Sequence, residues 1–364
     1  MTLLLSNEDV EKVLTMEVCL EALETLYREV GEERAVSTPR MDVHLPTPRS
    51  QGTDVPMAHY LKTMSGGTPS FGVAALRLTS DIVAWKKVGD LIRREKLPAL
   101  PGNRWLGLVL LFSSSNGELL AIMNDGVLQR MRVGGTNGLG VKYLARPDCR
   151  SAGLFGSGWQ AGSQLMALCA VRPMEKIKVY SPTREHREAF AGEMSEKLHV
   201  EVIPVDSPDE AARNVDLIIT ATNSRQPFLK GLWLKPGIHL SCMQRDEAED
   251  DAYEKSDVLV IHTHAMEHNF VSRDLVERHD REGFEVRDHP IPRKIDWARL
   301  PTLGDLVARR IQGRTSDEQI TCFVNNIGLG AQFAAVGARV YERARAQGLG
   351  RELPIDWFVE SVHP

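Results

Sequence analysis

The chain has 364 residues, more than one hydrophobic core usually supports, so we expect two domains. Hydrophobic residues make up 42% and charged residues 26% of the sequence, which excludes a disordered or fibrous protein. With a net charge of −5 and a pI near 6.2, the molecule has no overall field that attracts nucleic acid or anionic membranes. A small-molecule partner is therefore expected.

The cysteines favour a reducing compartment. They are five in number, far apart, and without the paired spacing that a zinc site or a disulfide framework requires. No stretch reaches the roughly 20 apolar residues that span a bilayer. We expect a soluble, cytoplasmic protein.

The first part of the chain combines a helical entry with an antiparallel sheet. Residues 6–36 show helical spacing of apolar side chains, and Ser6 suits a helix cap. Residues 41–123 contain several runs with strand character. Within them, Asn116 and Gly117 separate two apolar runs, the sequence signal for a hairpin with a two-residue turn.

Residues 81–103 interrupt these strands with a segment rich in lysine, arginine and proline. We expect a long loop or flap. We interpret it as a loop that extends into solvent. The alternative is a basic lid over an anionic substrate.

After a glycine-rich helix over residues 127–145, short apolar strands alternate with helices, which indicates a parallel sheet with crossovers. The first two strand–helix pairs are expected at 151–155 with 159–171 and at 176–180 with 184–198. A final helix is expected to open at residues 315–318 and to run through 323–346. The fold class is α/β, with a Rossmann-type NAD(P)-binding domain over 148–318 and an α+β substrate-binding and dimerisation domain over 1–147 and 319–364.

The stretch GLFGSGWQAG lies between the first strand and helix of that alternation. Gly156, Gly158 and Ala161 allow, in turn, a sharp turn, approach of a pyrophosphate to the backbone, and close packing of helix on strand. The helix then offers unpaired N–H groups to the phosphates. We predict that a dinucleotide binds at Gly156, Ser157, Gly158, Trp159, Gln160 and Ala161.

The end of the next strand indicates which dinucleotide binds. NAD enzymes usually place an acidic residue there for the ribose 2′-hydroxyl, and KVYSPTREH has none before the helix. Ser181, Thr183 and Arg184 instead suit a 2′-phosphate, although Ser181 or Thr183 also suits a helix cap. NADP(H) is therefore favoured over NAD(H).

Several stretches together resemble one family, the ornithine cyclodeaminase and mu-crystallin family, over most of the chain. They are QRMRVGGTNGLGVKYLAR, GLFGSGWQAG, VDLIITATNSRQPFL, GIHLSCMQRD and GRTSDEQIT, in that order. The resemblance implies a Rossmann domain, a separate substrate and dimerisation domain, and chemistry on amino acids or their imines. It also implies that Ala221 and Thr222, after the fourth strand, border the cofactor.

The same resemblance assigns the substrate site. Arg40 and Arg132 match the arginines that hold the substrate carboxylate, and Asp246 matches the catalytic aspartate. Arg77 stands where the family has a lysine, and an arginine does not give up a proton as a lysine does. Lys62 is the second candidate for that basic role.

Two further differences concern acids and histidines. A glutamate that the family has shortly after the aspartate is replaced by Ala252, although Asp250 and Asp251 are close. His262, His264 and His268 do not have the spacing of a metal site, and no metal is expected.

Three functions are compatible with these residues. The first is an NADPH-dependent reductase of imino acids, or the reverse oxidation of an amino acid, in which Asp246 hydrogen-bonds to the substrate nitrogen. The second is an ornithine- or lysine-type cyclodeaminase that holds NAD tightly and releases ammonia. The third is a non-catalytic binding protein of mu-crystallin type. A homodimer is expected in each case, because an exposed sheet and a long amphipathic C-terminal helix suit self-association.

Overall fold

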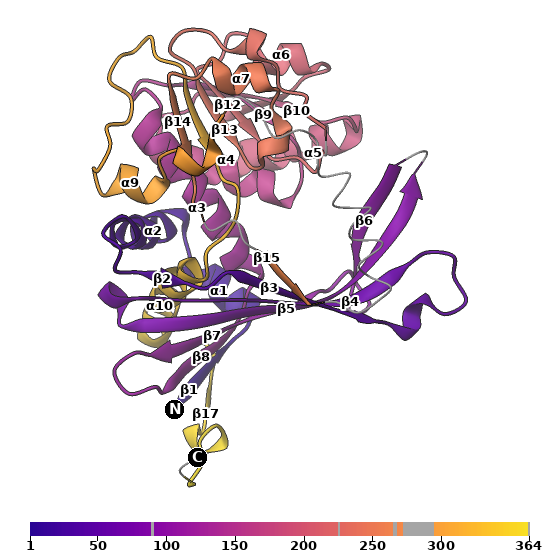
Figure 1. The fold of residues 1–364 in the computed structure, drawn as a ribbon, viewed down its shortest axis with the longest axis vertical. Coiled ribbons are helices and arrows are strands. Elements are labelled where there is room, and N and C mark those ends of the chain that lie inside the picture. The colour runs from indigo at the N-terminus through magenta and orange to yellow at the C-terminus, as the bar shows by residue number, and fades with distance from the viewer. Residues whose placement is uncertain (89–90, 225, 265–267, 272–294, 363–364) are drawn as a thin grey trace.

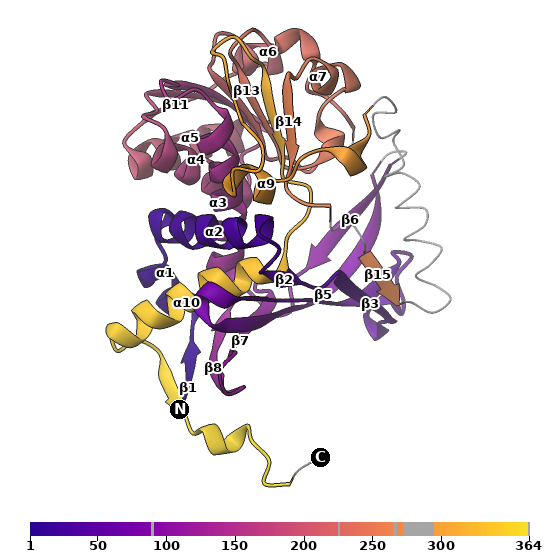
Figure 2. The same ribbon diagram turned by 60° about the vertical axis from the view of Figure 1, so that its left-hand side comes forward.

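Two sheets, one above the other in Figure 1, organise the chain. The computed structural model describes residues 1–88, 91–224, 226–264, 268–271 and 295–362. Helix α3 connects the sheets, and helices α2 and α10 lie between the upper layer and the strands of the lower sheet (Figures 1 and 2). Within the described residues, no helix combines the length and apolar character that crossing a membrane requires.

The lower sheet has ten strands in the order β15-β3-β4-β5-β7-β8-β1-β17, with β2 on β4 and β6 on β5. Its central strands pair antiparallel, as predicted, whereas β1 runs parallel to β8 and β15 parallel to β3. The strands are β1 (Thr2–Leu5), β2 (Val36–Ser37), β3 (Arg40–Pro46), β4 (Met57–Thr68), β5 (Val73–Val88), β6 (Leu91–Leu97), β7 (Leu106–Ser113), β8 (Leu119–Asn124), β15 (His268–Val271) and β17 (Arg351–Leu353).

The flap expected over residues 81–103 is largely a β-hairpin. The long strand β5 pairs with β7 along its first half and with β6 along its second half, from Ile82–Leu97 to Val88–Leu91. Buried Trp85 packs there with Tyr60 and Val83. The many charged residues of this segment favoured a loop. Their alternation along the chain nevertheless suits a two-stranded extension beyond the main sheet.

The hairpin at Asn116–Gly117 forms, but its connection is longer than predicted. The backbone N–H of Ser113 donates to the Glu118 carbonyl at 2.9 Å, so four residues lie between the last paired positions. Gly117 has φ +75°, a conformation that glycine adopts readily.

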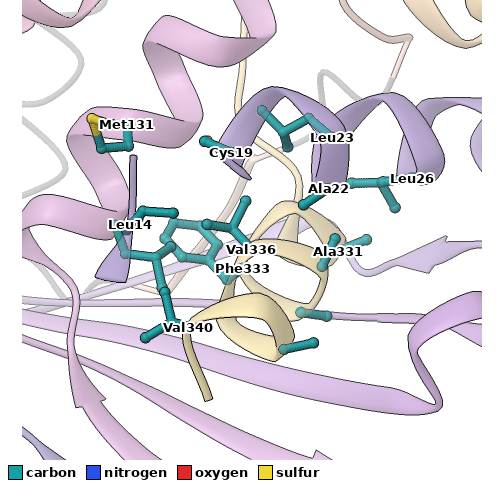
Figure 3. Packing of buried hydrophobic residues seen from close by; sticks show 14 of the residues in the cluster. Leu14, Cys19, Ala22, Leu23, Leu26, Met131, Ala331, Phe333, Val336 and Val340 are labelled. Carbon is teal, nitrogen blue, oxygen red and sulfur yellow. The ribbon is translucent and has the colours of Figure 1, made fainter. Parts of the chain in front are cut away.

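Helices α2 (Met16–Gly31) and α10 (Gly330–Ala346) form the main core with the lower sheet, as Figure 3 shows for Leu23, Phe333 and Val336. The helical segment predicted over residues 6–36 is two helices, because Thr15 starts a new cap after α1 (Asn7–Val13). Most of α10 is buried within its own chain, whereas Glu342, Arg343 and Arg345 near its end are exposed.

Helix α3 (Gly126–Leu144) is glycine-rich because its neighbours approach closely. A Cβ on Gly134 would lie 2.4 Å from the Ser163 carbonyl oxygen, and one on Gly138 would lie 2.9 Å from the Ala167 Cβ. The glycines thus replace side chains with direct helix–helix contact.

The upper sheet has seven parallel strands in the order β11-β10-β9-β12-β13-β16-β14. The predicted strands β9 and β10 and helices α4 and α5 have the bounds expected from the sequence. The elements are β9 (Ser151–Phe155), α4 (Trp159–Val171), β10 (Lys176–Tyr180), α5 (Arg184–Leu198), β11 (Glu201–Pro204), α6 (Pro208–Ala212), β12 (Leu217–Thr220), β13 (His239–Cys242), α7 (Asp250–Glu254), β14 (Val258–Ile261), α9 (Leu303–Val307) and β16 (Thr321–Val324).

The helix predicted to start near residue 315 was wrong at its beginning. Residues 321–324 form β16, a fully buried strand between β13 and β14, and the helix starts only at Gly330. A short apolar run does not distinguish a buried strand from a helix by its spacing. Residues 321–324 therefore lie in the parallel sheet, although the sequence assigned everything after 318 to the first domain.

Candidate functional site

Strand register places three of the four predicted substrate residues on one face of the ten-stranded sheet. Lys62 on β4 is the cross-strand partner of Asp42 on β3 and of Thr79 on β5. Arg40 and Arg77 lie two residues from Asp42 and Thr79, respectively. Because alternate residues of a strand share a face, Arg40, Lys62 and Arg77 point to the same side.

Arg40 is neutralised within the sheet. Its Nε lies 2.8 and 2.9 Å from the two Asp42 carboxylate oxygens, and its Nη2 donates to the Tyr60 hydroxyl at 2.7 Å. Tyr60 in turn donates to Asp42 at 2.5 Å. Burial opposes ionisation of Asp42, but the hydrogen bonds and charge of Arg40 outweigh it and hold the pKa of Asp42 below its usual value.

Arg77 also has a carboxylate partner. Its Nε and Nη2 both lie 2.7 Å from one Asp125 oxygen, and both residues are buried. A Cβ on Gly107 would lie 1.9 Å from Asp125 Oδ1, so glycine at 107 leaves the space in which this carboxylate sits. Neither Asp125 nor Gly107 was singled out in the sequence.

Arg132, on α3, differs because its partners are neutral. Oε1 of Gln129 accepts from Nε at 3.2 Å and from Nη2 at 2.7 Å, and Oε1 of Gln332 accepts from Nη1 at 3.0 Å. Among the residues described, no carboxylate forms an ion pair with it. Burial, and then the charge of Arg77, lower the pKa of Arg132 to about 9, so it is still cationic at neutral pH.

Two neighbours define the surroundings of this guanidinium. The Phe333 ring is shared by two cations, with its centroid 5.1 Å from Arg132 Cζ and 5.4 Å from Arg77 Cζ. A Cβ on Gly328 would lie 2.3 Å from Arg132 Nη1, so a larger residue there would displace the guanidinium. No sequence pattern pointed to Gln332, Phe333 or Gly328, which are far from Arg132 in the chain.

Of the four predicted substrate residues, Lys62 is the second for which the described residues provide no carboxylate in an ion pair. Its Nζ lies 4.9 Å from the centroid of the Tyr60 ring. Burial first, and then the charge of Arg40, lower the pKa of Lys62 well below that of a free lysine. The charged form of Lys62 is therefore disfavoured, and an anion nearby would stabilise it.

Asp246 lies at the C-terminal edge of the other sheet, in the short 3-10 turn Arg245–Glu247 after β13. It is half-buried, and none of the described contacts joins it to the four basic residues. Ligands of open parallel sheets bind at this edge.

Glu247, the fully buried residue next to Asp246, was not predicted as a site residue. Its carboxylate accepts from the Thr220 hydroxyl at 2.6 Å, the Thr222 hydroxyl at 2.7 Å, and the backbone N–H groups of Thr222 and Gln244 at 2.9 Å each. Burial raises the pKa of Glu247 despite these donors. The residue fixes the loops after β12 and β13, so the Thr222 hydroxyl is already engaged by the protein.

The glycine-rich turn has two differently used glycines. Gly156 has φ +110°, and a Cβ there would lie 2.3 Å from the Ala221 carbonyl oxygen, so the fold itself requires glycine. Gly158, which caps α4, has φ −87°, and apart from its chain neighbours no atom of the described residues lies within 4 Å of the position of its Cβ. Protein packing therefore does not explain glycine at 158.

The end of β10 has the polar residues that the sequence indicated. The Ser157 hydroxyl donates to the Ser181 hydroxyl at 2.9 Å, which ties the turn to this strand. Thr183 starts α5 without a side-chain cap hydrogen bond, and exposed Arg184 donates to Glu188 at 2.7 Å. Buried Arg187, which was not anticipated, donates to the Ser181 carbonyl at 3.0 Å and pairs with Asp206.

A further arginine, also missed, lies beside the turn. The Cζ of Arg130, on α3, is 3.9 Å from the centroid of the Trp159 ring, which is 60% exposed. A Cβ on Gly162 would lie 2.3 Å from Arg130 Nη2. The guanidinium thus rests on the first turn of α4.

No group of histidine, cysteine or acidic side chains suited to a metal ion is found in the described part of the chain. His268 lies in β15, and its side chain is outside the described residues. His262 is buried, and burial lowers its pKa to about 3.

Comparison with known proteins identifies relatives for the whole arrangement. The sequence profile of the ornithine cyclodeaminase/mu-crystallin family matches residues 81–348. A Delta(1)-pyrroline-2-carboxylate reductase of Bacillus cereus is 30% identical over 251 residues, which cover 68% of this chain and 74% of the relative.

Two solved structures have the same fold. A Thermococcus litoralis Delta(1)-pyrroline-2-carboxylate reductase in complex with NADH and L-proline superposes with a TM-score of 0.74 and 29% identity, covering 97% of this chain and 100% of that one. An archaeal alanine dehydrogenase dimer with bound NAD gives a TM-score of 0.71 at 24% identity, covering 97% and 99% of the two chains.

Proposed function

Because the chain belongs to the ornithine cyclodeaminase/mu-crystallin family, we propose that it is an NAD(P)H-dependent reductase of imino acids. Its substrate is an imine that carries a carboxylate, or the corresponding amino acid in the reverse direction. The observation that carries the proposal is Arg132, a buried cation whose described partners are two neutral amides. A buried charge without a counter-ion is unfavourable, and an anionic ligand removes that penalty.

The unpaired donors of Arg132 suit a carboxylate. A guanidinium has five N–H bonds, and the contacts to Gln129 and Gln332 account for three, on Nε, Nη1 and Nη2. One further N–H on each terminal nitrogen is left, which is the pair that binds a carboxylate in a fork. Lys62 adds a further hydrogen-bond donor on the sheet face that it shares with Arg40 and Arg77, which Asp42 and Asp125 hold.

Asp246 is proposed to act on the nitrogen of the bound imine. A carboxylate at the C-terminal edge of β13 can accept a hydrogen bond from an iminium N–H and so favour the protonated, electrophilic form. The bound nicotinamide supplies the hydride chemistry. The residues of the chain provide orientation, because the carboxylate is held on one side and the nitrogen on the other.

The residues at the glycine-rich turn fit a dinucleotide. Gly158 has open space where a side chain would be, at the N-terminus of a 13-residue helix that no side chain caps. A pyrophosphate that approaches the backbone accounts for this glycine. Arg130, which rests on Trp159 beside the same turn, is positioned to add positive charge to the phosphates.

We infer a preference for NADPH over NADH. The support is the set Ser181, Thr183 and Arg184, together with a Thr183 hydroxyl that does not cap its helix. The Arg184–Glu188 pair is exposed and therefore weak, so a 2′-phosphate can compete for the guanidinium. The relative bound to NADH argues for testing both cofactors.

We also propose a homodimer that works in a reducing compartment such as the cytoplasm. The dimeric archaeal alanine dehydrogenase, which has the same fold, supports the proposal of a homodimer. The five cysteines are free thiols, four of them buried, which agrees with a reducing compartment.

One assay separates the candidate reactions. The protein is incubated with NADPH or NADH and either a cyclic imino acid or pyruvate with methylamine, and the reduced-nicotinamide absorbance is followed; ornithine is offered separately with NAD. We expect consumption of the reduced cofactor. Ammonia release from ornithine without net absorbance change would instead support a cyclodeaminase, and binding without turnover in any mixture would support a non-catalytic protein.

A further inference from the structure

We propose that Gln332 is a positioning residue for Arg132, and that Tyr27 and His262 help to hold the Gln332 amide with its oxygen towards the guanidinium. The inference rests on the proposed function, in which Arg132 binds the substrate carboxylate. It concerns a buried network that joins α2, α3, α10 and the residue after β14, and thus both sheets.

The network can be followed from His262. Its Nδ1 lies against the Ile327 carbonyl, which only accepts hydrogen bonds, so Nδ1 carries the proton. Burial lowers the pKa of His262 to about 3, so the ring is neutral and Nε2 is an acceptor. The Tyr27 hydroxyl, 2.6 Å away, therefore donates to Nε2.

Because Tyr27 has used its only proton, its oxygen must accept from the next group. That group is the Gln332 Nε2, at 2.7 Å, which also donates to the Thr136 hydroxyl at 2.6 Å. Thr136 in turn donates to the Arg132 carbonyl at 2.8 Å. Both amide protons of Gln332 are thus committed to hydroxyls.

The other end of the Gln332 amide is then fixed as well. Its Oε1 faces Arg132 Nη1 at 3.0 Å and accepts the backbone N–H of Leu329 at 2.8 Å. A flipped amide would place an NH2 group against a guanidinium and an N–H donor, with no acceptor between them. The donors Arg132 and Leu329 at one end, and Tyr27 with its proton donated to His262 at the other, therefore favour the same orientation of the amide.

Because Gln332 is a neutral acceptor, it does not cancel the charge of Arg132, as a carboxylate would. Asp125 holds Arg77 and cancels its charge, whereas Gln332 holds Arg132 and leaves its charge for the ligand. Glutamate at 332 would keep the length of the side chain but supply an internal counter-ion to Arg132. It would also lose the two donors to Tyr27 and Thr136.

The test compares Gln332→Glu and Tyr27→Phe with a matched control, Tyr143→Phe. Tyr143 is on α3, and its hydroxyl donates to Glu24 outside the network. The full-length protein loaded with NADH or NADPH is titrated with L-proline and L-alanine, and KM, kcat and cofactor affinity are measured with the substrate identified above. Circular dichroism and melting temperature verify folding.

We expect Gln332→Glu to weaken carboxylate binding and raise KM at least tenfold, with cofactor affinity unchanged and a smaller effect on kcat. Tyr27→Phe should raise KM severalfold, and Tyr143→Phe should not change it.

Unchanged carboxylate affinity in Gln332→Glu would overturn the positioning role while leaving the proposed function in place. Equal losses in Tyr27→Phe and Tyr143→Phe would do the same, because they would indicate a general loss of stability. Should Gln332→Glu fail to fold, the comparison of the two tyrosine variants decides. A wild-type protein that neither binds these carboxylates nor reduces any imine would contradict the proposed function and the inference together.

Discussion

The two sheets treat their buried ionisable groups in opposite ways. On the ten-stranded sheet, Arg40 and Asp42 are held charged by each other. Beside this sheet, on α3, Arg132 is a cation without a carboxylate partner among the described residues. In and beside the seven-stranded sheet, burial lowers the pKa values of His239 and His262 to about 3, which keeps both neutral, and raises that of Glu247.

This difference distinguishes residues whose charge is left for a ligand from residues whose hydrogen bonds are all made within the protein. Glu247 has four donors from its own chain, so its polar capacity is used within the fold. Arg132, beside the ten-stranded sheet, has no carboxylate partner among the described residues, which is unfavourable until an anion binds. We therefore expect substitutions on that face to change substrate binding, and substitutions at the other sheet to change turnover, stability or cofactor choice.

The largest effect is expected for Asp246→Asn, at the edge of the seven-stranded sheet. An amide cannot take up a proton from the reacting nitrogen, so kcat should fall by roughly a thousandfold, within the range of general acid–base catalysis. Fluorescence titration should show unchanged NADPH affinity. The control is Asp250→Asn on α7, which should retain activity; wild-type turnover in Asp246→Asn would refute the assignment.

Arg132→Gln should have the next largest effect, and mainly on KM. Loss of a charge-assisted fork to a carboxylate is worth about 3 kcal/mol, or roughly a hundredfold. Steady-state kinetics with varied imine should show the rise in KM, while cofactor affinity stays the same. Exposed Arg345→Gln serves as the control, and a normal KM in Arg132→Gln would mean that the carboxylate binds elsewhere.

Acid should destabilise the seven-stranded sheet through its neutral histidines. Because the folded-state pKa values of His239 and His262 are about 3 and the unfolded value is about 6.5, only the unfolded chain takes up these protons between those limits. The free energy of unfolding in urea should fall as the pH drops below about 6.5. His239→Gln should reduce this slope, and His186→Gln, at an exposed site, should not. Identical slopes in all three proteins would refute this cause.

The smallest effect is expected for Arg184→Ala at the end of β10. Removal of an exposed charge from a 2′-phosphate should weaken NADPH binding by about tenfold and leave NADH binding unchanged. Lys197→Ala, on the same helix but far from the turn, is the control. Equal losses for both cofactors would show that Arg184 does not read the 2′-phosphate.

Local patterns made most of the parallel sheet predictable. The bounds of β9, α4, β10 and α5 follow from apolar runs, glycines and helix caps that lie within a few residues of each other. The start of α10 and the strand at residues 321–324 could not be predicted from such local patterns. A four-residue apolar run becomes a strand only when it pairs with neighbours, here β13 and β14. The charged hairpin β5–β6 was missed for a similar reason, since its pairing partner decided its conformation.

The candidate site was predictable to the same extent. Sequence resemblance named Arg40, Arg77, Arg132 and Asp246, whose roles stay predictions until they are measured. It did not identify Asp125, Gln332 or Glu247, because the function of each depends on a partner that folding brings close. A charge can be seen in a sequence, but whether it is neutralised cannot.

The ten-stranded sheet contains strands from the first and the last part of the sequence. β1 pairs with β8 and with β17, so Thr2 lies opposite Leu353, and α10 covers the same core as α2. On the ribosome, α10 emerges only after the whole seven-stranded sheet has been synthesised. We therefore expect the dinucleotide-binding half to fold first during translation, while the charged face stays uncovered until the last helix arrives.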